Sequence, residues 1–206
     1  MKFPVVLFDL DGTLVDSAAA ILGSFHHATE TVLRRRFPDD EILSRVGGTN
    51  LAHQMALLDP DRVDELVRVY RAHNDPQYSE LACFEGVLDV LQQLKVEGRR
   101  LGIVSAKRRP TVERVVRSAG MGEYFDVVVG SDDTQRHKPD PEPVLKALEV
   151  LEAGPDEAAY VGDSPFDVAA ARAAGVFAVA IGWGGIHRVE DADAFVETPE
   201  ALLGVL

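Results

Sequence analysis

The segment Val5-Val-Leu-Phe-Asp-Leu-Asp-Gly-Thr-Leu14 decides how the rest of the chain is interpreted. Residues 5–8 form a short apolar run, which is typical of a strand buried on both faces of a parallel sheet. Two carboxylates, Asp9 and Asp11, follow this run directly, and Gly12 lets the backbone turn tightly behind them. Ligands of open parallel sheets bind beyond the carboxyl ends of the strands. The segment therefore predicts a buried strand that ends in a functional loop.

The second half of the chain alternates between apolar runs and helical patterns from Gly86 onward. This alternation predicts a parallel sheet with helices on both faces, and hence the α/β class. The further strands are expected at about 101–104, 126–129, 158–161 and 177–181, the last of them ending the sheet. The helices between them are expected at about 87–97, 110–119, 141–152 and 165–174.

The region between about 17 and 84 contains helical patterns and no strand pattern. One of its helices is expected to start at Asp59, as N-cap, with Pro60 in the first helical position, and to end near Asn74. A helical stretch that follows the first strand of a parallel sheet is best interpreted as an insertion. We therefore expect residues 17–83 to form a cap on a catalytic core made of residues 1–16 and 84–206.

Composition limits the classes of partner and location. The chain has 206 residues and a formal net charge of −13, which disfavours nucleic acid or an anionic membrane as the main partner. No apolar run is long enough to span a bilayer, and the N-terminus does not resemble a signal peptide. A single cysteine, Cys83, excludes an internal disulfide. We expect a cytoplasmic protein, either a monomer or a homodimer.

The expected strand ends carry residues suited to phosphate chemistry. Carboxylates as close as Asp9 and Asp11 raise each other's pKa, and a bound divalent cation offsets this repulsion. Asp9 and Asp163 offer hard oxygen ligands of the kind that Mg²⁺ prefers, with water and substrate phosphate in the other positions. Asp9 is then placed to attack phosphorus, and Asp11 to protonate the leaving oxygen and later to activate water.

A second set of residues is expected to contact the substrate phosphate. Gly12 allows close backbone approach, and Ser105 and Lys138 would bind phosphate oxygens and neutralise charge in the transition state. Lys107 and Arg108 follow Ser105 and could contact a second anionic group. Gly47 and Gly48 lie between two expected cap helices and could face the site.

These motifs together resemble the haloacid dehalogenase-like superfamily of phosphatases. The matching segments are Asp9-Leu-Asp-Gly-Thr13, Ser105 after an apolar strand, Lys138-Pro139 and Gly162-Asp-Ser-Pro-Phe-Asp167. The resemblance spans the chain and implies a Rossmann-like core with a helical cap.

The resemblance also implies a role for each matched residue. Asp9 would be the nucleophile and a Mg²⁺ ligand. Asp11 would be the acid/base and would offer its backbone carbonyl to the metal. Asp163 would bind Mg²⁺, and Asp167 would support the metal directly or through water. The substrate phosphate would lie against Gly12, Ser105, Ala106 and Lys138.

Two positions separate the reactions known in this superfamily. Dehalogenases lack an aspartate at position 11, so Asp11 favours phosphoryl transfer. The β-phosphoglucomutase-like members carry a histidine where this chain has Ile21, which makes a mutase less favoured, although Ser105-Ala106 resembles the mutase pattern. A non-enzymatic module that binds a phosphometabolite is a third interpretation, against which the intact acidic residues argue.

The substrate is left open between two close alternatives. The chain resembles phosphoglycolate phosphatases and a related bacterial pyrophosphatase subgroup, the latter in segments 59–74, 103–107 and 137–144. A small phosphorylated metabolite is therefore the leading expectation, with pyrophosphate as the alternative. Trp183 and His187 could line the rim of the site after the last strand.

Overall fold

The computed structural model describes residues 2–184, 189 and 191–206. Within these residues the strands form one six-stranded sheet in the order β3-β2-β1-β4-β5-β6, and every neighbouring pair is parallel. The α/β fold class is thus confirmed. The strands are β1 (Val5–Phe8), β2 (Arg100–Val104), β3 (Val127–Val129), β4 (Ala158–Gly162), β5 (Phe177–Ile181) and β6 (Ala194–Val196).

Helices cover both faces of the sheet because successive side chains of each strand alternate between the faces. In β1, Val6 and Phe8 join the core cluster that contains residues of α5, α6 and α9, whereas Val5 and Leu7 join the cluster of α7 and α8. These helices are α5 (Val87–Val96), α6 (Arg109–Ser118), α7 (Glu142–Val150), α8 (Pro165–Ala173) and α9 (Leu202–Val205), with short 3₁₀ turns at Pro155–Glu157 and Pro199–Ala201.

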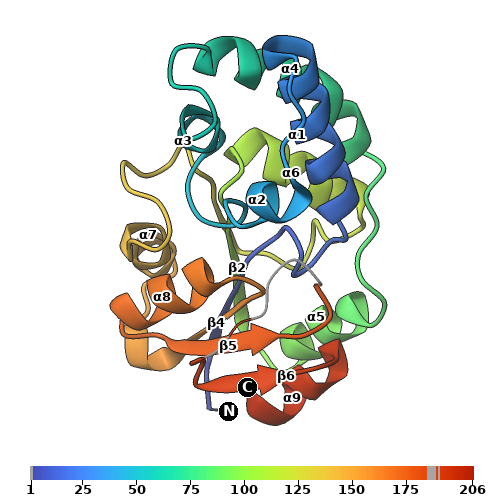
Figure 1. Cartoon of the computed structure of the whole chain (residues 1–206). Coiled ribbons are helices and arrows are strands. Elements are labelled where there is room, and N and C mark those ends of the chain that lie inside the picture. The colour runs from blue at the N-terminus through green and yellow to red at the C-terminus, as the bar shows by residue number, and fades with distance from the viewer. Residues whose placement is uncertain (1, 185–188, 190) are drawn as a thin grey trace.

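The segment between β1 and α5 contains four helices, which are grouped at one end of the molecule, at the top of Figure 1. They are α1 (Ala18–Leu33), α2 (Asp39–Leu43), α3 (Leu51–Ala56) and α4 (Val63–Tyr78). Apolar packing holds α1 against α4, including an edge-to-face contact between Phe25 and Tyr70 with ring centroids 5.0 Å apart. The helix bundle touches the core where Asn50 Nδ2 lies 2.6 Å from His137 Nε2.

One strand was missed by the sequence analysis, which ended the sheet at Ile181. The sixth strand, β6, is only three residues long and forms the edge of the sheet, with Phe195 exposed. A three-residue run beside the acidic residues Asp191 and Asp193 gives too little periodicity to predict a strand.

The predicted limits of α4 were wrong at both ends. Asp59 is not its N-cap: the Asp59 carboxylate accepts a bond from the Asp61 amide at 3.0 Å, which makes a local turn, and the helix begins at Val63. The helix also continues past Pro76 to Tyr78. Pro76 is exposed, so water can satisfy the carbonyl that its missing amide leaves free. Among all the helices described, none has the length and apolar character needed to cross a membrane.

Candidate active site

The central strands of the sheet end side by side and bring their following residues together. Phe8, the last residue of β1, is in register with Ile103 of β2 and with Val161 of β4. The backbone amide of Asp9 extends the ladder by donating to the Val161 carbonyl at 2.9 Å. In the same way, the backbone amide of Ser105 donates to the Val129 carbonyl at 2.9 Å. Polar residues after three adjacent strands therefore share one end of the sheet.

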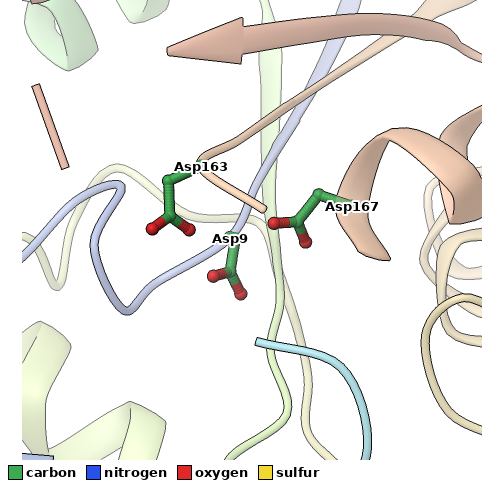
Figure 2. A group of neighbouring side chains, drawn as sticks. All are labelled: Asp9, Asp163 and Asp167. Carbon is green, nitrogen blue, oxygen red and sulfur yellow. The ribbon is translucent and has the colours of Figure 1, made fainter. Parts of the chain in front are cut away.

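Three buried carboxylates form a cluster at this end, as Figure 2 shows. Asp9 follows β1, Asp163 follows β4, and Asp167 lies in the first turn of α8. One carboxylate oxygen from each lies within 4.8 Å of the others. Asp163 Oδ2 is buried and has no hydrogen-bond partner among the described residues. A buried carboxylate oxygen without a hydrogen-bond partner is suited to be a metal ligand, because a bound cation would compensate it.

The cluster is partly neutralised by Lys138, whose side chain is buried. Its ammonium group donates to Asp9 Oδ1 at 2.9 Å and to Asp167 Oδ1 at 2.6 Å. Burial acts to lower the pKa of Lys138, but the two carboxylates outweigh it and raise this pKa above its ordinary value. Lys138 is therefore a fixed positive charge beside the carboxylates.

Lys138 does not fully compensate the negative charge of the three carboxylates, and ionising Asp9 and Asp163 is unfavourable. Burial, together with the neighbouring Asp167 and Asp11, raises the pKa of Asp9 from 3.8 to about 7, although Lys138 opposes the shift. Burial, together with Asp167, Asp9 and Asp11, raises the pKa of Asp163 well above its usual range, although Lys138 opposes the shift. Asp9 and Asp163 thus bind protons more tightly than exposed aspartates do, because their negative charges are buried close to other carboxylates.

Asp167 differs from the other two because both of its oxygens already have partners. Oδ1 accepts from Lys138 and from the hydroxyl of Tyr160 at 2.9 Å, and Oδ2 accepts from the amide and hydroxyl of Ser164 at 3.1 and 2.5 Å. The sequence analysis missed Tyr160, whose hydroxyl also lies 3.2 Å from Lys138 Nζ. Its only sequence signal is a polar group in an otherwise apolar strand.

Asp11 lies apart from the cluster and faces the inserted helices. Its Oδ1 accepts a bond of 2.5 Å from the hydroxyl of Tyr78, the last residue of α4. Asp9 and Asp11 both line a cavity of about 30 Å³ between the sheet and the helices. Ile21 and Lys107 line the same cavity. The sequence analysis also missed Tyr78, because it ended α4 at Asn74.

The residues predicted at the substrate phosphate lie in different surroundings. Ser105 and Lys138 line a second small pocket, which shares Ala106 with the cavity beside Asp9. Ser105 is buried and its hydroxyl oxygen accepts from the Lys107 amide at 3.2 Å. Ala106 lines the small cavity and also a larger cleft of about 230 Å³ beside it. Gly12 has a φ of 77°, in the left-handed region that glycine favours.

The four predicted specificity residues have unequal surroundings. Gly47 lines the small cavity with a φ of 93°, whereas Gly48 packs so close to Phe166 that a β-carbon would lie 2.9 Å from its ring. The ammonium of Lys107 lies 3.3 Å from the Tyr70 hydroxyl. Arg108 lines the larger cleft, where its guanidinium lies 3.7 Å from Asp132.

Of the two residues predicted at the rim of the site, the structure describes Trp183. Trp183 is half-buried, and its indole N–H donates to the carbonyl of Thr13 at 3.0 Å, which anchors the loop after β1. His187 lies outside the residues that the structure describes.

A parallel sheet with carboxylates and a buried lysine at its strand ends defines an α/β enzyme of the Rossmann-like type. The sequence model of the haloacid dehalogenase-like hydrolase family matches residues 6–181, and the chain therefore belongs to that family. Membership in this family makes the protein an enzyme, and the resemblance stated from the motifs is confirmed.

Several named relatives are similar over most of their length. Pyrophosphatase PpaX of Bacillus thuringiensis (strain Al Hakam) is 39% identical over 184 residues, which cover 89% of this chain and 85% of that protein. A protein of Caldanaerobacter subterraneus, provisionally named pyrophosphatase PpaX, is 37% identical over 100% of this chain and 96% of its own. A solved structure from Lactobacillus plantarum, provisionally named a phosphoglycolate phosphatase, has a TM-score of 0.90 and 27% identity, with full coverage of both chains.

Proposed function

We propose that this protein is a Mg²⁺-dependent phosphohydrolase in which Asp9 attacks phosphorus and forms an aspartyl-phosphate intermediate. The observation that carries this proposal is the buried group of Asp9, Asp163 and Asp167. Lys138 is bonded to two of them, and one oxygen of Asp163 has no hydrogen-bond partner within the described part of the chain. A structural ion pair alone would not leave a buried carboxylate oxygen without a partner, because that arrangement is destabilising.

The donor set fits a hard divalent cation such as Mg²⁺. Asp9 and Asp163 are the proposed carboxylate ligands, with the backbone carbonyl of Asp11 as a third. Asp167 is proposed to act indirectly, because Lys138, Tyr160 and Ser164 occupy both of its oxygens. When bound, the cation would neutralise charge on the phosphoryl oxygens.

Each step of the reaction is assigned to a residue of this chain. The Asp9 carboxylate forms the new O–P bond while the bond from phosphorus to the leaving oxygen breaks, and Asp11 gives that oxygen a proton. Water then attacks phosphorus, Asp11 takes back a proton, and the O–P bond to Asp9 breaks. Gly12 and Ala106 leave room for the phosphoryl group, and the Ser105 hydroxyl and Lys138 ammonium bind its oxygens. Residues 17–83 are proposed to act as the cap that excludes water.

Two features favour a small substrate with a second anionic group. The cavity beside Asp9 is only about 30 Å³, and Lys107 is a cation among the residues that line it. Pyrophosphate is our first candidate, supported by the names of the relatives at 37–39% identity, and phosphoglycolate is the second. A mutase is disfavoured because Ile21, which cannot exchange protons, lines the cavity where mutases carry histidine.

A phosphate-release screen tests the proposal. The purified protein should release phosphate with Mg²⁺ from pyrophosphate or phosphoglycolate faster than from sugar phosphates and nucleotides. Interconversion of sugar-phosphate isomers without phosphate release would instead support a mutase. No release from any of these compounds would contradict the proposed function.

Mg²⁺ is expected to stabilise the protein more at about pH 8 than at about pH 5. Between its ordinary pKa of 3.8 and its folded-state pKa of about 7, Asp9 binds more protons in the folded than in the unfolded chain. The metal-free protein should therefore lose stability as pH rises through this window, and Mg²⁺, which needs ionised ligands, should restore it. Melting temperatures with and without millimolar Mg²⁺ measure the effect.

The Asp163→Asn variant provides the comparison for this prediction, because it lacks the carboxylate with the unpaired oxygen. Its melting temperature should respond to Mg²⁺ much less than that of the wild type at the higher pH. An equal Mg²⁺ response in both proteins, or at both pH values, would contradict a metal site at these carboxylates.

Lys107→Met is expected to weaken the hydrolysis of a substrate with a second anionic group. Loss of a charge-assisted contact should lower kcat/KM for pyrophosphate by roughly 10- to 100-fold. The kcat/KM for p-nitrophenyl phosphate, which has no second anionic group, should fall much less. Arg108→Met is the matched comparison, since Arg108 already faces Asp132 and lies outside the small cavity. An equal loss on both substrates would argue against this role of Lys107.

A further inference from the structure

Tyr78 makes a contact that the reaction steps above do not use. It is the last residue of α4, its side chain is fully buried, and its hydroxyl donates to Asp11 Oδ1 at 2.5 Å. Asp11 belongs to the loop after β1, whereas Tyr78 belongs to the inserted helices. The hydrogen bond therefore joins the proposed acid/base to the proposed cap.

The direction of this bond restricts where Asp11 can carry its proton. A phenol keeps its proton at neutral pH, so the Tyr78 hydroxyl is the donor in this bond and Asp11 Oδ1 is the acceptor. A carboxyl oxygen that accepts such a bond is a poor site for a proton of its own. Oδ2 is the oxygen that this contact leaves available for proton transfer to the leaving group.

The ring of Tyr78 is itself held in place from the core side. The Lys107 ammonium, in the loop after β2, lies 4.4 Å from the centre of the Tyr78 ring and 3.3 Å from the Tyr70 hydroxyl. A cation over an aromatic face at this separation is attractive, more so where water is excluded. Asp11, Tyr78 and Lys107 thus form a chain of contacts from the first strand loop, through the helix end, to the second strand loop.

We propose that Tyr78 is a positioning residue that orients Asp11 for proton transfer and makes this orientation depend on the place of the helical segment. The inference rests on the proposed function, since it assumes that Asp11 protonates the leaving oxygen. When the helices are seated on the core, Asp11 presents Oδ2 to the substrate. When the helices move away from the core, Asp11 loses the hydrogen bond that fixes its orientation. Proton transfer is therefore efficient only while the helices are packed on the core.

The consequence depends on the leaving group of the substrate. An alkyl phosphate expels a poor leaving group and needs the proton from Asp11, whereas 2,4-dinitrophenyl phosphate expels a phenolate that needs none. Loss of the Tyr78 hydroxyl should thus slow formation of the phosphoenzyme from the first substrate and spare it for the second. A merely structural defect would slow both alike.

The test compares Tyr78→Phe with wild type in single-turnover and pre-steady-state measurements with Mg²⁺. The single-turnover rate on an alkyl phosphate should fall by roughly 10- to 100-fold, while the initial burst of dinitrophenolate should stay within about twofold. Because one protein sample serves both substrates, partial unfolding cancels in the ratio. In the Asp11→Asn background, Tyr78→Phe should cause little further loss.

Tyr70→Phe is the matched control, because Tyr70 is also a buried tyrosine, but its hydroxyl lies 3.3 Å from the Lys107 ammonium, whereas the bond to Asp11 comes from Tyr78. It should change the two rates by similar factors. Equal effects of Tyr78→Phe on both substrates, or no effect on either, would overturn the positioning role. Absence of Mg²⁺-dependent release of dinitrophenolate and phosphate by the wild type would instead overturn the proposed function, so the two failures can be told apart.

Discussion

Replacing Asp9 by asparagine is expected to reduce turnover by about 10⁴-fold or more. The amide has nearly the same shape as the carboxylate but cannot attack phosphorus, so the chemical step is lost while the fold is kept. Burial and the neighbouring carboxylates already raise the pKa of Asp9 to about 7. Removing its charge should therefore stabilise the metal-free protein at alkaline pH, in contrast to its effect on activity. Phosphate release and melting temperature, measured on the same preparation, test both halves of the prediction.

Asp16→Asn is the control for this substitution. Asp16 lies seven positions further along the same loop region, but its side chain is exposed. Its activity should stay within about twofold of the wild type, as for most surface substitutions. Mass spectrometry of the Asp9→Asn preparation should show that the amide has not reverted to a carboxylate. Substantial activity in a verified Asp9→Asn protein would contradict the assignment of the nucleophile.

Replacing Lys138 by methionine is expected to damage both stability and activity. Methionine keeps the apolar volume of the side chain but removes the charge that is bonded to Asp9 and Asp167. Breaking a buried ion pair on one side typically destabilises a protein by about 3–5 kcal/mol, because the partner charges stay buried. Loss of the cation beside the phosphoryl oxygens should also lower kcat by roughly 10²- to 10³-fold. Chemical denaturation and phosphate release measure the two effects.

The loss of stability in Lys138→Met should be smaller when one of the carboxylates that Lys138 contacts is neutralised. Adding Asp167→Asn to Lys138→Met should recover part of the lost free energy of unfolding, because one buried charge is removed. Activity should not recover, since the amide does not replace the ammonium group. Lys146→Met is the control: Lys146 pairs with Glu149 on the exposed side of α7, and such pairs contribute about 1 kcal/mol or less. A Lys138→Met protein as stable as this control would contradict the structural role of the lysine.

The sequence was sufficient to predict that polar residues after several strands lie at the same end of the sheet. Asp9, Ser105 and Asp163 each follow a buried apolar run, and parallel strands bring their carboxyl ends together without further information. The cluster of Asp9, Asp163 and Asp167 lies where this argument places it. Local patterns succeed here because the alternation of strands and helices indicates that the strands are parallel and buried on both faces.

The contacts that complete the site could not be predicted in the same way. Tyr160 and Tyr78 act through hydroxyl groups that meet residues distant in the sequence, and no local pattern specifies such a pair. The end of α4 was placed too early because Pro76 is a helix breaker in most interiors, whereas here it sits on an exposed side. The edge strand β6 was missed because its three residues are too few to show a period.

The central claim is that phosphate passes through Asp9, and chemical trapping tests it most directly. The protein should be mixed with substrate and Mg²⁺, quenched, and reduced with borohydride, which converts an acyl phosphate of aspartate to homoserine. Using Asp11→Asn, which lacks the base for the hydrolytic step, should increase the trapped fraction. Peptide mass spectrometry should find homoserine at position 9 only when both substrate and Mg²⁺ are present. Phosphate release without any change at position 9, or with the modification at another residue, would contradict the account.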